Sequence, residues 1–132
     1  MALIPFDDRD GEIWLDGRFV PWRDSKLHVL THGLHYASCV FEGERAYGGK
    51  VFKLREHTQR LHDSATILGF KIPFTADAID AATAELLKRN GIVDGYVRPV
   101  AWRGSEMMAV SAQQTAIHVA IATWPWPSYF AP

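Results

Sequence analysis

The chain has 132 residues and a formal net charge of −1, and its 48% of hydrophobic residues is enough for the core of one domain. The absence of a signal peptide, of a run of about 18 apolar residues and of a basic excess argues against a membrane or a nucleic acid as partner. The single cysteine cannot form an internal disulfide, which favours a cytoplasmic location.

The first half of the chain is predicted to contain mainly strands. Residues 1–11 are expected to be a flexible leader. The segment EIWLDGRFVPW has two short apolar runs around Asp16–Gly17, which is typical of a β-hairpin. Residues 27–37 fit either a helical turn or a loop, and SCVFEGERAYGGKVFKL is predicted to form two strands joined at Gly48–Gly49.

Two helices are expected next. In REHTQRLHDSATILGF, Leu61, Ala65 and Leu68 fall on one stripe, and the glycine before the final phenylalanine ends the helix. Thr75 is a plausible N-cap for ADAIDAATAELLKRN, which ends at Gly91.

The last elements are again strands. GYVRPVAWRG alternates like a strand, although Pro99 requires an edge position or a bulge. A loop over 104–115 separates it from the β-prone run AIHVAIATW. The order of elements predicts an α+β domain over residues 12–126, an antiparallel β-sheet with two α-helices packed on one face. Residues 127–132 are predicted to begin an interdomain linker.

The stretch LHVLTHGLHYASCVFEG raises the question of a metal or a Cys–His site. His28, His32 and His35 have helical spacing, but Gly33 weakens a helix, and the chain has no CxxC or HExxH motif. The favoured interpretation is that the histidines orient loops through hydrogen bonds, and no metal site is predicted. Cys39 opens an apolar strand and is interpreted as a buried small hydrophobe, not a nucleophile.

The arginines are more informative. In a strand over 95–102, Tyr96, Arg98, Val100 and Trp102 share one face. An arginine between two rings needs an anionic partner, which is either a ligand or an internal carboxylate, Glu42 or Glu44. Phe41, Gly43, Arg45 and Tyr47 share a face of the earlier strand, where the glycine would let a ligand approach the backbone.

Arg60 lies beside the apolar stripe of the first predicted helix. Its guanidinium could be aimed at a phosphate or carboxylate. Alternatively, the side chain could simply extend into solvent from the edge of the helix.

Three motifs, HGLHYASCVFEGERAY, REHTQRLHDSA and YVRPV, resemble in order and spacing the amino-terminal domain of branched-chain aminotransferases. These are class IV, fold type IV enzymes that use pyridoxal 5'-phosphate, and the resemblance extends from about Ile13 to Trp126. It implies that Arg60 binds the cofactor phosphate. It also implies a substrate pocket lined by Tyr36, Phe41, Tyr96, Arg98 and Trp126.

The resemblance further implies amino transfer between leucine, isoleucine or valine and 2-oxoglutarate, as in branched-chain amino acid biosynthesis. The substrates would be amino acids and 2-oxo acids. In relatives the loop whose apolar tip would fall near Met108–Val110 reaches the active site of the neighbouring subunit, so a homo-oligomer based on dimers is expected.

One departure from the family concerns the Schiff-base lysine, which the family carries in a second domain. None of the five lysines matches it: Lys26, Lys50, Lys53, Lys71 and Lys88. No catalytic residue is therefore assigned, and the chain alone is expected neither to transaminate nor to hold the cofactor. The alternatives are another class IV enzyme (a D-amino-acid or amine transaminase, or an aminodeoxychorismate lyase) or a non-catalytic association module that uses the aromatic residues of 124–130.

Overall fold

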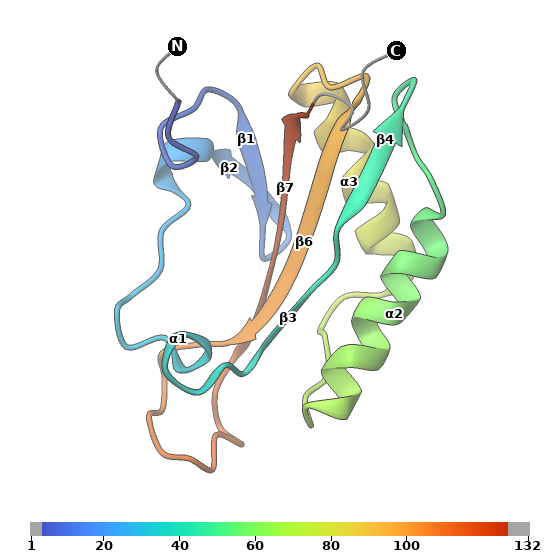
Figure 1. The fold of residues 1–132 in the computed structure, drawn as a ribbon. Helices are drawn as coiled ribbons and strands as arrows, with labels where there is room; N and C mark the ends of the chain where they lie inside the picture. Colours follow the sequence, from blue (N-terminus) through green and yellow to red (C-terminus); the bar gives the residue numbers. More distant parts are fainter. Residues whose placement is uncertain (1–3, 127–132) are drawn as a thin grey trace.

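The computed structural model describes residues 4–126. Within this range seven strands form one antiparallel sheet in the order β2-β1-β7-β6-β4-β5, and β3 pairs with β6 next to β4 (Figure 1). The strands are β1 (Glu12–Leu15), β2 (Arg18–Pro21), β3 (Cys39–Phe41), β4 (Glu44–Tyr47), β5 (Lys50–Val51), β6 (Gly95–Arg103) and β7 (Ile117–Pro125).

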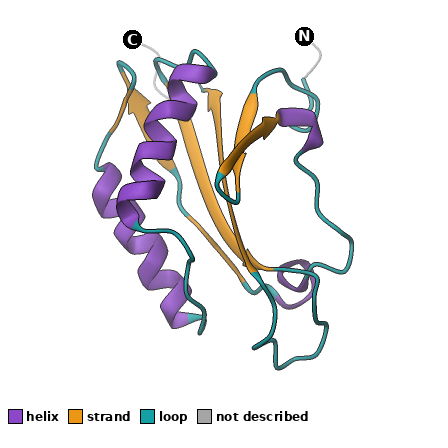
Figure 2. Cartoon of the chain, turned by 180° about the vertical axis from the view of Figure 1, so that it is seen from behind, coloured by secondary structure: helices purple, strands orange, loops and turns teal. Residues whose placement is uncertain are grey.

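Two long helices, α2 (Leu54–Ile67) and α3 (Ala76–Arg89), cover one face of the sheet, as the view from behind shows (Figure 2). A 3-10 helix (Trp22–Asp24) and the short α1 (His32–Tyr36) lie in the connection between β2 and β3. The predicted fold class, an antiparallel sheet with two helices on one face, is therefore confirmed. Among the described residues no helix is both long and apolar enough to cross a bilayer.

The core lies between the sheet and these helices. Along β6, Val97 and Ala101 are fully buried and point to the helices, where Leu61 and Ala65 of α2 pack. The alternating residues of β6 point to the opposite face, which α2 and α3 do not cover; this face is called the open face below. Leu68 was expected on the packed stripe, but it follows the end of α2 and is exposed, so the prediction is wrong at that position.

The predicted turns and caps are in place. Asp16 and Gly17 both have positive φ (51° and 92°), as the tight turn between β1 and β2 requires. Gly48 and Gly49 join β4 to β5. The hydroxyl of Thr75 accepts a hydrogen bond from the Ala78 N–H at 3.1 Å, which confirms it as the N-cap of α3.

Pro99 lies in the central strand β6, not at an edge or in a bulge as expected. Its partner strand is interrupted at this level, because β3 ends at Phe41 and β4 begins at Glu44. The Pro99 carbonyl accepts the Glu42 N–H at 3.1 Å, so the missing Pro99 N–H also faces the interruption. The pairing register continues from Phe41–Val100 to Glu44–Val97, so the proline leaves only the one bond that it cannot donate unmade, at the point where β3 and β4 separate.

Residues 4–11, part of the predicted leader, contact the folded body. The carbonyl of Phe6 accepts a hydrogen bond from the Trp22 indole at 2.6 Å, and the Phe6 ring lies 5.1 Å from the Trp124 ring. Residues 127–132, the predicted linker, lie outside the described residues, and the boundaries of the predicted domain stay a prediction.

Candidate functional site

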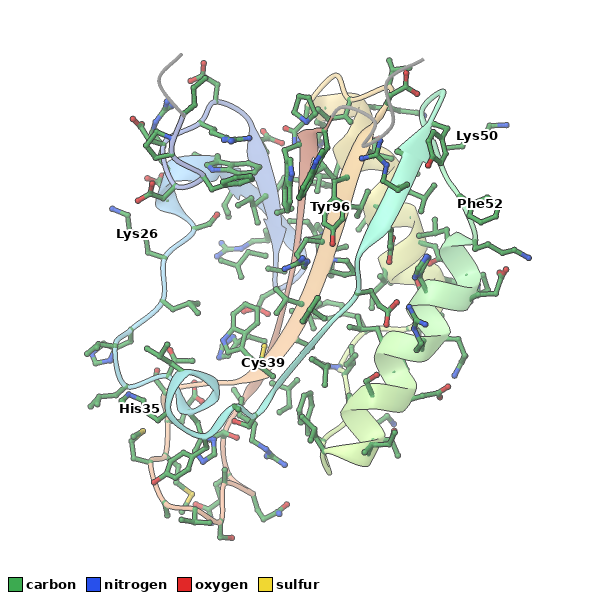
Figure 3. All side chains as sticks on the ribbon, viewed as in Figure 1. Lys26, His35, Cys39, Lys50, Phe52 and Tyr96 are labelled. Carbon is green, nitrogen blue, oxygen red and sulfur yellow. The ribbon has the colours of Figure 1, made fainter. Side chains whose placement is uncertain are left out.

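The open face carries the predicted arginine strand. Tyr96 projects from β6 on the side away from the helices (Figure 3). The Arg98 Nη2 donates a hydrogen bond to the Tyr96 hydroxyl at 2.9 Å, and the guanidinium carbon lies 4.2 Å from the centre of the Phe41 ring. Three of the predicted pocket residues are therefore in contact, and the cation lies against an aromatic face.

Arg98 does not form the internal ion pair that the sequence allowed. Within residues 4–126 it has no carboxylate partner, and its buried Nε atom has no hydrogen-bond partner. Glu42 and Glu44, the two candidates, are buried on the face that carries the helices. The alternation of strand residues separates them from Arg98, so that interpretation is wrong.

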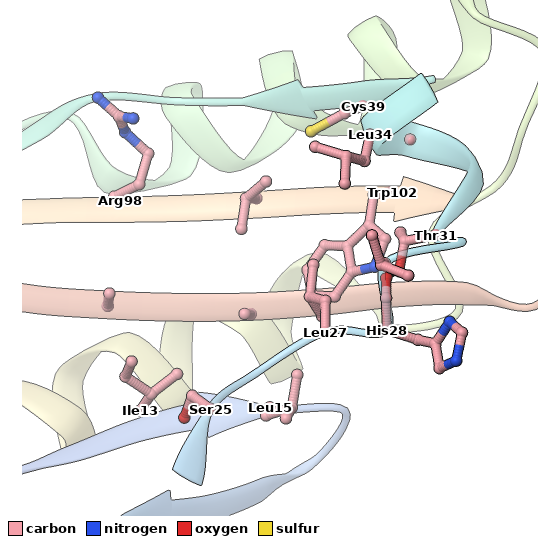
Figure 4. Close-up of a pocket in the computed structure, with 15 residues that line it drawn as sticks. Ile13, Leu15, Ser25, Leu27, His28, Thr31, Leu34, Cys39, Arg98 and Trp102 are labelled. Carbon is pink, nitrogen blue, oxygen red and sulfur yellow. The ribbon is translucent and has the colours of Figure 1, made fainter. Parts of the chain in front are cut away.

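A cavity of about 670 Å³ lies on the open face, with Arg98 at one end (Figure 4). Apolar side chains make up most of its wall, and they come from β1, the connection before α1, α1 itself, β6 and β7: Ile13, Leu15, Leu27, Val29, Leu34, Val100, Trp102, Ala120 and Ala122. An apolar hollow with one guanidinium at its end suits a ligand that has an aliphatic part and an anionic part.

Tyr96 also organises the aromatic residues near the end of β7. Its ring lies 4.9 Å from Trp124 and 4.8 Å from Trp126. The Trp126 carbonyl accepts a hydrogen bond from Arg45 Nη2 at 3.1 Å. The structure thus brings Trp126 next to Tyr96, which in turn contacts Arg98.

Gly43, where a ligand was expected to approach the backbone, lies against Tyr96. A Cβ atom at this position would clash with the Tyr96 hydroxyl oxygen. The glycine therefore makes room for Tyr96, whose hydroxyl receives the Arg98 bond.

Tyr36 lies apart from Phe41, Tyr96 and Arg98. Its hydroxyl donates to the Met108 carbonyl at 3.0 Å, and its ring stacks on His32 at 4.4 Å. His32 in turn bonds Ser38 Oγ at 2.6 Å and the Ala109 carbonyl at 3.0 Å. Tyr36 is thus connected to the loop between β6 and β7, not to Arg98.

The other histidines of this stretch also bond locally. His28 Nδ1 accepts the Leu30 N–H at 3.0 Å, and His35 Nε2 donates to the Val29 carbonyl at 2.7 Å. These contacts support the interpretation that the histidines orient the loop.

Cys39 is exposed, not buried as expected, because Val40 takes the core position of this short strand. It lies on the wall of the open-face cavity (Figure 4). Desolvation by its apolar neighbours raises the pKa of the thiol, so the less nucleophilic protonated form is favoured.

Arg60 projects from α2 toward Glu42, between β3 and β4. Its Nε lies 3.0 and 2.9 Å from the two carboxylate oxygens, and its Nη2 donates to Oε1 at 2.7 Å. His57 Nδ1 donates to the same carboxylate at 2.8 Å. Arg60 and His57 also line a surface cavity of about 330 Å³ with Lys53 and Glu56. Arg60 therefore does not simply extend into solvent, because the Glu42 carboxylate accepts hydrogen bonds from two nitrogens of its guanidinium.

The segment 41–43 connects the two arginines. Phe41 contacts Arg98 on the open face, while the next residue, Glu42, binds Arg60 on the other side of the strand. The partners Glu42 and His57 were missed as site residues from the sequence. A signal was present, because strand alternation places Glu42 toward the core, where a carboxylate needs a cation.

Comparison with known proteins finds a matching family and similar sequences. Residues 39–132 match the family model for amino-transferase class IV. A branched-chain-amino-acid aminotransferase of Pseudomonas aeruginosa is 48% identical over 126 residues, which cover 92% of this chain and 41% of that protein. A probable branched-chain-amino-acid aminotransferase of Rickettsia felis is 44% identical over 125 residues, which cover 95% and 43%.

Solved structures agree. The crystal structure of the Escherichia coli branched-chain amino acid aminotransferase matches with a TM-score of 0.87 at 38% identity, over 93% of this chain and 42% of that one. A second branched-chain amino acid aminotransferase, solved with pyridoxamine 5'-phosphate, gives a TM-score of 0.87 at 38% identity, with 93% and 42% coverage. The enzyme of the thermophilic archaeon Thermoproteus uzoniensis, solved with norvaline, gives 0.85 at 38% identity, with 92% and 42% coverage. The chain thus spans about two fifths of the length of the relatives it matches.

Proposed function

The chain belongs to the class IV aminotransferase family, and from this premise we propose that it supplies the phosphate-binding and substrate-binding part of a pyridoxal-phosphate-dependent branched-chain aminotransferase. The observation that carries the proposal is Arg98, a guanidinium without a carboxylate partner among the described residues, at the end of an apolar cavity. The reaction would transfer an amino group between leucine, isoleucine or valine and 2-oxoglutarate.

This arrangement suits two chemically different substrates. The apolar wall would take the aliphatic side chain of a branched amino acid. Arg98, held by the Tyr96 hydroxyl, would form a charge-assisted pair with the distal carboxylate of glutamate or 2-oxoglutarate. Phe41 and Trp126 would complete the aromatic side of the pocket.

Arg60 would bind the cofactor phosphate. The guanidinium has five N–H donors, and Glu42 engages its Nε–H and one N–H of Nη2, so three donors remain for phosphate oxygens. The side chain is 66% exposed beside a surface cavity, so an anion could reach it. The bound cofactor would supply the electron sink for amino transfer.

Tyr36 is proposed to act together with the loop at Met108, to which its hydroxyl is bonded. The tip of this loop is expected to reach a neighbouring subunit, so Tyr36 would contribute to a substrate pocket only in an oligomer based on dimers.

We expect the full-length protein to convert leucine and 2-oxoglutarate to 4-methyl-2-oxopentanoate and glutamate when pyridoxal phosphate is present. The 132-residue chain alone should not, because none of its lysines matches the family's Schiff-base lysine. Steady-state assays of both proteins, with D-alanine and aminodeoxychorismate as rival substrates, test this. Turnover of a rival but not of leucine would assign another class IV activity, and turnover by the short chain would contradict the proposal.

In the full-length protein, Arg60→Ala should weaken pyridoxal phosphate binding about 10- to 100-fold, the scale of one charge-assisted contact. Titration of the cofactor-free protein, followed by absorbance, gives the dissociation constant. Arg55→Ala is a matched control, because Arg55 is on the same helix but pairs with Asp77 and Asp80. Equal cofactor affinities for Arg60→Ala and the wild type would refute the phosphate role.

A further inference from the structure

Glu42 is held at its backbone and its carboxylate by different elements. Its N–H donates to the Pro99 carbonyl of β6 at 3.1 Å. Its carboxylate accepts hydrogen bonds from His57 and Arg60 of α2. The residue is only 5% exposed, so these contacts enclose both its backbone and its side chain.

Glu42 also keeps its charge. Burial alone would raise the pKa of its carboxyl group, but the hydrogen bonds from Arg60 and His57 outweigh burial, and the pKa lies below its usual value. An ionised carboxylate only accepts hydrogen bonds, so it matches the two N–H groups that Arg60 directs toward it.

The consequence falls on Arg60, whose side chain is exposed to 66%. An exposed arginine without a partner samples many rotamers, and binding an anion would require that freedom to be lost. The two-point contact with Glu42 fixes the plane of the guanidinium before any ligand arrives. The N–H groups not used by Glu42 then have a fixed direction.

We infer that Glu42 is a positioning residue that orients the Arg60 guanidinium for a phosphate group, while His57 holds the Glu42 carboxylate in place. This inference rests on the proposed role of Arg60. Glu42 itself makes no contact with the ligand in this scheme, and its negative charge opposes phosphate binding.

Because of this opposition, the direction in which the dissociation constant changes distinguishes positioning of Arg60 from a simple effect of charge. In the full-length protein, Glu42→Gln should weaken pyridoxal phosphate binding about 5- to 30-fold, the factor that corresponds to the rotamer freedom of an unpaired arginine. Glutamine cannot replace the carboxylate, because its amide NH₂ would face an N–H donor of Arg60. If Glu42 only offset the charge of Arg60, the same substitution would tighten binding.

Glu56→Gln is the matched control for charge. Glu56 lies on α2 and lines the same surface cavity, but it pairs with Lys53 and not with Arg60. Removing its charge should leave the dissociation constant unchanged or lower it slightly. A loss of affinity equal to that of Glu42→Gln would overturn the inference, because charge at this surface would then explain both.

A double-mutant cycle separates positioning from a general structural role. With Arg60→Ala as background, Glu42→Gln should change the dissociation constant by less than about twofold, since no guanidinium remains to be oriented. Additive losses would overturn the inference. If Arg60→Ala alone has no effect on binding, the proposed function fails at this site, and that outcome is visible before Glu42 is considered.

Glu42→Asp provides a second variant if Glu42→Gln folds poorly. It keeps the negative charge but withdraws the carboxylate by one methylene, so the two-point contact with Arg60 is lost. We expect weaker binding of pyridoxal phosphate here too, measured below the thermal midpoint of each variant. Affinity equal to the wild type would mean that charge alone is sufficient and would refute positioning.

Discussion

Glu44→Gln should raise the free energy of unfolding by about 3–5 kcal/mol at pH 8.5 and leave it nearly unchanged near pH 4. Glu44 is 2% exposed on the helix-covered face of β4, and its Oε1 has no hydrogen-bond partner among the described residues. Desolvation, and then the charges of Glu42 and Asp80, raise the pKa of its carboxyl group to about 8. An amide of the same shape removes the ionisation without opening a cavity.

The direction follows from proton linkage. In the unfolded chain the pKa of Glu44 has its ordinary value of 4.5, whereas in the folded protein it is about 8. Below the lower pKa both states hold the proton and the group costs nothing. Between the two values the unfolded state loses its proton first, so stability falls as pH rises, by up to about 1.4 kcal/mol per pH unit. Above the higher value the full cost is present.

Chemical denaturation of wild type and variant from pH 4 to 8.5 measures this difference, because contributions from other titrating groups cancel in it. Glu56→Gln, which removes an exposed carboxylate on α2, is the control for the substitution itself and should change the free energy of unfolding by no more than about 0.5 kcal/mol. A wild-type-minus-Glu44→Gln difference that is flat across the range would show that the Glu44 carboxyl finds a partner or water in solution.

Periodicity in the sequence was sufficient to predict most of the helices and strands of the fold. The helical stripe with Leu61 and Ala65, and the cap at Thr75, depend on neighbours within one element. The same holds for the shared face of Tyr96 and Arg98, which two-residue alternation determines. Such predictions succeed because side-chain directions repeat at a fixed spacing along a helix or a strand.

The errors concern contacts between elements. Cys39 was expected in the core, but side chains alternate along the three-residue strand β3, and because Val40 points inward, Cys39 and Phe41 point outward. Pro99 was expected at an edge because the sequence of β6 does not show that a central strand can leave one bond unmade opposite Glu42. The partner of Arg60 depends on how α2 crosses the segment at Glu42, which no local pattern specifies.

The burial of polar groups limits which arginine can pair with Glu42 or Glu44. Alternation places Glu42 and Glu44 on one face of their segment, and once Glu44 pairs with Val97, Arg98 lies on the opposite face of β6, which excludes an ion pair between them. The sequence could not indicate that His57 and Arg60 would satisfy one carboxylate and leave the other without a cation. That difference is set by the position of α2.

The second large effect concerns Arg98. In the full-length protein, Arg98→Leu should reduce transition-state stabilisation for glutamate by about 2–4 kcal/mol, the scale of leaving a desolvated carboxylate unpaired. The half-reaction with leucine should be nearly unchanged, because leucine has no second carboxylate and the apolar wall beside Val100 and Trp102 remains. The structure sharpens this expectation, since Arg98 has neither Glu42 nor Glu44 as an internal partner whose loss would damage the fold.

Single-turnover kinetics with each amino acid on the aldehyde form of the enzyme measure the two half-reactions separately. Arg45→Leu is the matched control for charge: Arg45 lies opposite Tyr96 on the neighbouring strand and does not line the cavity, so its removal subtracts the same charge from the same face, together with the hydrogen bond to the Trp126 carbonyl. A loss for glutamate in Arg98→Leu that exceeds the loss in Arg45→Leu assigns direct contact with the distal carboxylate. Equal losses for leucine and glutamate in Arg98→Leu would instead mean that Arg98 holds Tyr96 and the scaffold, or binds the α-carboxylate that both substrates share.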